Sequence, residues 1–152
     1  MLSISAYPQQ YIDEARARIA EQARAFDAMA QAVRGAGAAA GATGAAGAAL
    51  DALEPEYFAN LVIALDSHFV HRSRGQERKD GNAMNEVRVL VSSIQLHDGV
   101  MTAERAIRLD PSRSVLGIAY GERIRIDAQG FERLARAFFE TLEATYAEPM
   151  PG

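Results

Sequence analysis

The residues best suited to chemistry gather between Asp66 and Arg88, in the stretch DSHFVHRSRGQERKDGNAMNEVR. Imidazole, guanidinium, carboxamide and carboxylate groups occur there together, and these groups bind anions, hold metals or transfer protons in proteins. The candidate ligand-binding residues of this stretch are His68, His71, Arg72, Arg74, Asn82, Asn85, Glu86 and Arg88. They predict a polar site where two expected helices, 55–72 and 82–97, meet through the connection 73–81.

One interpretation of this stretch is a site for a small anion. A helix that begins at Asn82 would present free backbone N–H groups and a partial positive charge. Arg72 and Arg74 precede it, and guanidinium groups pair well with phosphate or carboxylate. Glu86 opposes an anion, and the chain lacks the GxxxxGK[ST] phosphate loop. A solvated charged connection with internal ion pairs is the alternative, and both readings stay open.

Metal binding and catalysis have less support. His68 and His71 are three residues apart, but the chain has neither an HExxH motif nor the paired Glu-x-x-His motifs of a carboxylate metal site in a bundle. The sequence therefore assigns no metal ligand, and metal binding stays an open alternative. Ser67 precedes His71 by four residues, yet no nucleophile elbow accompanies it. The sequence identifies no cofactor and leaves open whether the chain is an enzyme, including a hydrolytic one.

A further interpretation concerns two polar strips on the expected helices. The strip on helix 82–97 consists of Asn85, Arg88, Ser92 and Gln95. The strip on helix 55–72 consists of Asn60, Ser67 and His71. If the strips face each other, they form a hydrogen-bonded seam or line a small-molecule pocket. Simple exposure on the surface is the alternative.

The bulk composition predicts one soluble globular domain over residues 1–152. The net charge of −4 excludes a basic field over the whole domain, so no strong nucleic-acid signal exists. The absence of cysteine excludes disulfides and thiolate chemistry. No apolar run approaches the roughly 20 residues that cross a bilayer. We expect a cytoplasmic protein that does not enter membranes.

The periodicity of apolar residues predicts four main helices, at 8–34, 55–72, 82–97 and 128–146. Asn82 and Asp127 are the expected N-caps of the last two. Between the last two helices, residues 101–127 alternate apolar and polar side chains, and Gly121 suits a tight turn. The predicted fold is therefore mainly α, a four-helix-bundle-like domain with a small β-hairpin before the last helix. A one-turn helix at 112–116 is the alternative for part of that segment.

The first expected helix suggests a function of its own. Ile12, Ile19, Phe26 and Val33 recur every seven residues, which is typical of a seam that packs on another helix. That helix belongs either to the same chain or to a second subunit. The leading hypothesis is a self-associating or partner-binding module, with a homodimer formed through helix 8–34. Residues 35–49 are almost all Gly and Ala, and we predict a flexible linker there, with a helical extension as the alternative.

Overall fold

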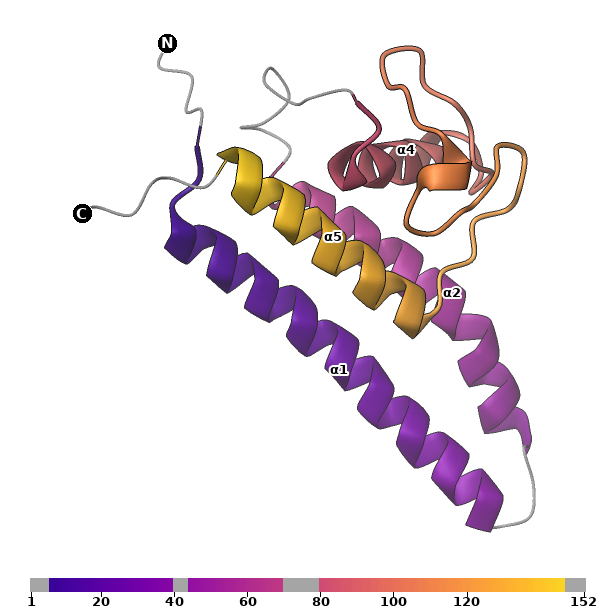
Figure 1. Cartoon of the computed structure of the whole chain (residues 1–152). Helices are drawn as coiled ribbons and strands as arrows, with labels where there is room; N and C mark the ends of the chain where they lie inside the picture. The colour runs from indigo at the N-terminus through magenta and orange to yellow at the C-terminus, as the bar shows by residue number, and fades with distance from the viewer. Residues whose placement is uncertain (1–5, 40–43, 70–79, 147–152) are drawn as a thin grey trace.

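The computed structural model describes residues 6–39, 44–69 and 80–146. The helices within these ranges are α1 (Gln9–Ala39), α2 (Gly44–Ser67), α4 (Ala83–Leu96) and α5 (Ala128–Tyr146), with a 3₁₀ turn η1 (Pro111–Arg113). They pack against one another as a mainly α bundle (Figure 1). This confirms the predicted helical class.

Helices α2 and α5 contact each other and form the middle of the bundle. Helix α1 contacts both of them, and so does α4 (Figure 1). The N–H of Tyr7 donates to the carbonyl oxygen of Tyr146 at 2.7 Å. This bond joins the start of α1 to the end of α5, so these two helices run antiparallel.

The core is built on phenylalanines from three helices. Phe26 of α1 lies 5.0 Å from Phe58 of α2, between ring centroids, and Phe58 lies 5.4 Å from Phe131 of α5. All three are at most 2% exposed. Burying a side chain of this size contributes about 1.5–3 kcal/mol, so this cluster of rings contributes strongly to holding α1 on the bundle.

The heptad seam of the first helix packs inside the chain. Ile12, Ile19 and Phe26 are at most 2% exposed, and Val33 is partly buried against the same core. Since α1 contacts α2 and α5, these helices supply the partner surface that the seam requires. The seam is therefore used within the fold.

The last two helices begin where their caps predict. The side-chain oxygen of Asn82 accepts from the N–H of Asn85 at 3.1 Å, ahead of α4. The side-chain oxygen of Asp127 accepts from the N–H of Gly130 at 2.7 Å, ahead of α5. Each cap satisfies a donor that has no partner inside its helix.

The Gly/Ala segment differs from the predicted linker. Residues 35–39 continue α1 and residues 44–49 belong to α2, while 40–43 lie outside the described residues. Helix α2 thus begins before the predicted 55, carries Pro55 inside it, and ends at Ser67 rather than 72. Alanine is the best helix former, and Leu50 is buried, so propensity and packing together offset the cost of the glycines.

The predicted β-hairpin is wrong for the described structure. Residues 98–127 contain no strand, and their ladder pairing is one antiparallel bridge between Val100 and Arg123. The Gly121 N–H donates to the Met101 carbonyl at 2.8 Å, which ties the expected turn to the beginning of the same segment. Alternate apolar residues are buried nonetheless, namely Ile107, Leu109, Ile124 and Ile126. The alternation of apolar and polar residues thus reflects burial of every second side chain without pairing into a sheet. The turn η1 at Pro111–Arg113 overlaps in part with the one-turn helix expected as the alternative at 112–116.

Candidate functional site

Three of the eight predicted site residues, His71, Arg72 and Arg74, lie outside the described residues. The other five fall in two places. His68 follows the end of α2, and the remaining four belong to the start of α4, namely Asn82, Asn85, Glu86 and Arg88. The anion-binding interpretation therefore stays a prediction.

Asn82 and Asn85 form a reciprocal cap at the start of α4. Asn82 accepts from the Asn85 N–H, and the fully buried side chain of Asn85 accepts from the Gly81 N–H at 2.9 Å. The side-chain amide of Asn82 also donates to Asp80 at 2.8 Å. Both asparagines thus have a structural role, because they satisfy backbone donors where the chain enters the helix.

Glu86 is a buried carboxylate that holds a distant loop. It is 2% exposed. Its two oxygens accept from the N–H groups of Val115 and Leu116, at 2.9 and 3.0 Å. Hydrogen bonds to an ionised acceptor are about twice as strong as neutral ones. Glu86 therefore anchors the 98–127 segment to α4, a role that sequence reasoning missed because these partners are remote in sequence.

His68 and Arg88 are each half-buried. The His68 ring lies beside Phe69, with 6.2 Å between centroids, and the His68 carbonyl accepts from the Tyr11 hydroxyl. Burial, and after it the charge of Arg18, lower the pKa of His68, so the neutral imidazole is favoured. Within the described ranges, no three His, Asp or Glu side chains are placed to share a metal ion.

The two polar strips do not form a buried seam in the described structure. Asn60, Ser67 and Gln95 are exposed, and the Ser67 hydroxyl donates to the Ala64 carbonyl of its own helix at 2.7 Å. The buried serine of α4 is the adjacent one, Ser93, which accepts from the Thr102 N–H at 2.9 Å. Exposure on the surface, the alternative that the sequence left open, describes Asn60, Ser67 and Gln95.

A different feature emerges from the packing of α1 on α5. The two helices leave a groove of about 580 Å³ between them. Its apolar lining residues are Ile19, Ala20, Ala23, Ala128, Phe131, Ala135 and Phe139. Its charged lining residues are Arg16, Arg24, Asp27, Glu132, Arg136 and Glu140. The groove thus has an apolar floor and a rim of both charge signs, and the sequence signal for it was the alanine-rich face of α1 beside its apolar seam.

Some rim charges are paired and others are not. The Arg16 guanidinium lies 5.0 Å from the centroid of the Phe139 ring and pairs with Glu143. Glu132 pairs with Arg136 one turn along α5, at 2.9 Å. Three further rim residues make no ion pair with any described residue, namely Arg24, Asp27 and Glu140. These charges are available to a molecule that enters the groove.

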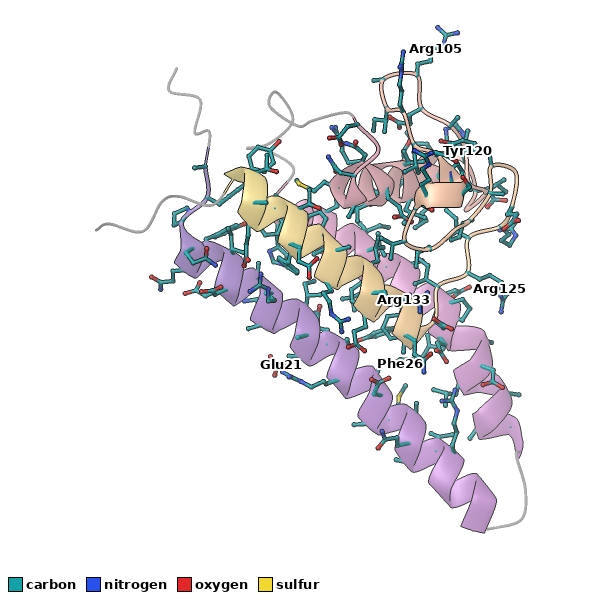
Figure 2. The ribbon with its side chains drawn as sticks, in the orientation of Figure 1. Glu21, Phe26, Arg105, Tyr120, Arg125 and Arg133 are labelled. Carbon is teal, nitrogen blue, oxygen red and sulfur yellow. The ribbon has the colours of Figure 1, made fainter. Side chains whose placement is uncertain are left out.

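Figure 2 shows where the labelled side chains lie around these features. Glu21 projects from α1 away from α5, on the outer side of the bundle (Figure 2). Arg105 and Tyr120 belong to the segment beside α4 (Figure 2). The Tyr120 hydroxyl donates to the Leu109 carbonyl at 2.8 Å, and burial raises the pKa of Tyr120. Because Glu21 projects away from α5, the outer face of α1 offers control positions for experiments on the groove.

Comparison with family models, curated proteins and solved structures finds no match to this chain. No helix within the described ranges combines the length and apolar character needed to cross a membrane.

Proposed function

We propose that this protein is a helical interaction module that binds an amphipathic helix of a partner polypeptide in the groove between α1 and α5. One observation carries the proposal: an apolar floor lies open between two helices and is framed by charges that make no ion pair with described residues, Arg24, Asp27 and Glu140. Protein interfaces of this kind combine an apolar centre with a polar rim.

The side chains of the floor suit a helix. Ala20, Ala23 and Ala135 are partly exposed there, while Ile19 and Phe139 beneath them are nearly buried. Helix axes pack about 8–10 Å apart, and small side chains allow the nearer end of that range. A third helix laid along the groove would cover these alanines and bring its own flanking charges to the rim.

The charges of the rim disfavour a small anion. Asp27, Glu132 and Glu140 all line the groove, so an isolated phosphate or carboxylate would meet carboxylates as well as guanidinium groups. A helix with flanking residues of both signs can match both kinds of charge. Among the polar residues at the start of α4, Asn85 and Glu86 already hold backbone N–H groups of the fold.

Photo-crosslinking tests this proposal. A photoreactive phenylalanine analogue is placed at Ala23, in the groove, and at Ala25, which is exposed and does not line it. Both variants are produced in the cells that naturally make the protein, and adducts are mapped by peptide mass spectrometry. We expect one polypeptide segment with helical apolar periodicity to crosslink at position 23 and not at position 25.

A second variant strengthens the result. Ala135→Arg fills the groove from α5 and should abolish the adduct at position 23. Far-ultraviolet circular dichroism must show unchanged helix content for all variants. Equal yields at positions 23 and 25, or no polypeptide adduct at 23, would overturn the proposal.

A further inference from the structure

We propose that the helix in the groove belongs to a second copy of this chain, with the two grooves face to face about a two-fold axis that runs along the helices. In this arrangement α1 of each copy lies over α5 of the other. The inference rests on the proposed function and names its partner. The order of charges along the two walls of the groove carries it.

The relative height of the charges follows from a contact between the walls. Arg16 of α1 lies over the ring of Phe139 of α5, and the helices run antiparallel. Arg24 is eight residues beyond Arg16, and Glu132 is seven residues back from Phe139. At 1.5 Å per residue these steps are about 12 and about 10.5 Å, so Arg24 and Glu132 lie at nearly the same height.

The heights of the other rim charges follow from the same rise of about 1.5 Å per residue. Glu140 lies level with Arg16, and Arg136, three residues back from Phe139, lies level with Ala20. The α1 wall thus carries a positive charge at each of the two heights where the α5 wall carries a negative one. Arg136 stands level with a neutral residue.

A two-fold axis along the helices keeps every height and brings opposite walls together. Arg24 then faces the partner's Glu132, and Glu140 faces the partner's Arg16. Arg16 and Glu132 keep their ion pairs to Glu143 and Arg136 within their own copy. Because the operation is symmetric, each pair occurs twice. Arg136 faces the partner's Ala20, so no like charges meet among these rim residues.

The other face-to-face arrangement fails on the same charges. An axis across the helices would place α1 on α1 with heights reversed. With the two grooves fully overlapped, Arg16 would then face the partner's Arg24, and Glu132 would face the partner's Glu140. Four like-charge contacts would replace four opposite-charge contacts, which costs both affinity and on-rate.

The contact is short, which sets the strength to expect. From Arg16 to Asp27 the groove follows about 16.5 Å of α1. Contacts this small lie at the weak end of protein interfaces, so we expect reversible dimers at micromolar concentration or above.

Sedimentation equilibrium over a wide concentration range tests the arrangement. Arg24→Glu and Glu132→Arg should each weaken the dimer by about tenfold or more, because each creates two like-charge contacts. An equimolar mixture of the two variants should recover the wild-type association. Within each chain of the mixture, positions 24 and 132 still carry like charges, so recovery can come only from contacts between chains.

Matched controls use exposed charges of α1 that do not line the groove. Arg18→Glu and Glu21→Arg make the same charge changes there and should leave the dimer constant within about twofold. Unchanged circular dichroism confirms that all variants fold.

Two outcomes would overturn the inference. If the two groove variants associate like the wild type, or their mixture does not recover, the charge pairing is refuted. If the wild type stays monomeric at all concentrations, the second copy is refuted. In that case a crosslink from position 23 to a different polypeptide would still support the proposed helix-binding function, so the two failures are distinguishable.

Discussion

Removing the charge of Glu86 should destabilise the whole fold. In Glu86→Gln the remaining side-chain oxygen still accepts from one backbone N–H. The new amide NH₂ group must then face the second backbone N–H, which is also a donor. One charge-assisted hydrogen bond is lost, and the N–H of Val115 or Leu116 is left without its acceptor. Such a loss costs about 2–3 kcal/mol. For a chain of this length the midpoint of thermal unfolding should fall by about 4–12 °C.

Two measurements check this prediction. Urea unfolding followed by circular dichroism gives the free energy, with Glu122→Gln as the control, since Glu122 is an exposed carboxylate of the same segment. Amide hydrogen exchange at Val115 and Leu116 should accelerate in Glu86→Gln more than exchange inside α5. The longer truncation Glu86→Ala should cost about 3–4 kcal/mol, because both donors lose their acceptor.

A change in the free energy of unfolding of less than about 0.5 kcal/mol in Glu86→Gln, the size expected of a surface substitution, would refute the stabilising role of Glu86. Unchanged hydrogen exchange at Val115 and Leu116 would show that the hydrogen bonds from these N–H groups to Glu86 do not protect them. A large loss with unchanged exchange there would mean that Glu86 stabilises the core by another route.

Further predictions concern single positions. Gly81 has φ +83°, and a Cβ there would lie 2.7 Å from the Arg108 carbonyl oxygen, so Gly81→Ala should cost more than about 2 kcal/mol in urea unfolding. Gly35→Ala, in an open part of α1, should instead stabilise the protein by about 0.5–1 kcal/mol. A Gly81→Ala variant as stable as the wild type would contradict the expected difference in sign between the two substitutions. Asn82→Ala should cost about 1 kcal/mol through the lost cap of α4, and an unchanged unfolding midpoint would exclude that cap. The lowered pKa of His68 means that the unfolded chain binds its proton first as pH falls through about 6.5. The contribution of His68 to the free energy of unfolding is therefore fully present above that pH and decreases below it. His68→Gln should reduce the difference in unfolding free energy between about pH 7.5 and about pH 5.5. An unchanged difference would contradict the lowered pKa.

The start of α4 and the whole of α5 were predictable because their signals are local. An N-cap side chain bonds to a backbone N–H three residues away, so Asn82 and Asp127 mark their helices without help from the rest of the chain. The apolar stripe of α5, including Phe131 and Phe138, likewise reports a helix that buries one face. Neighbouring residues carry all of this information.

The conformation of segment 98–127 could not be predicted from local sequence patterns. Alternate burial of Ile107 and Leu109 is visible in the sequence, but a strand also requires a backbone partner, which no local pattern specifies. The buried carboxylate of Glu86 accepts from two N–H groups of that segment instead, and Gly81 leaves room for the Arg108 carbonyl beside it. Both contacts join residues that are far apart in sequence.

The candidate site shows the same division. Residue types marked Asn82, Asn85 and Glu86 as special, and burial confirms that Asn85 and Glu86 differ from ordinary surface polar groups. Residue type alone cannot tell a ligand-binding side chain from one that serves the fold, because both need the same donors and acceptors. The groove is a property of two helices that meet only after folding. The sequence by itself determined which faces of α1 and α5 are apolar, and the antiparallel packing of those helices decided which part of the faces stays open.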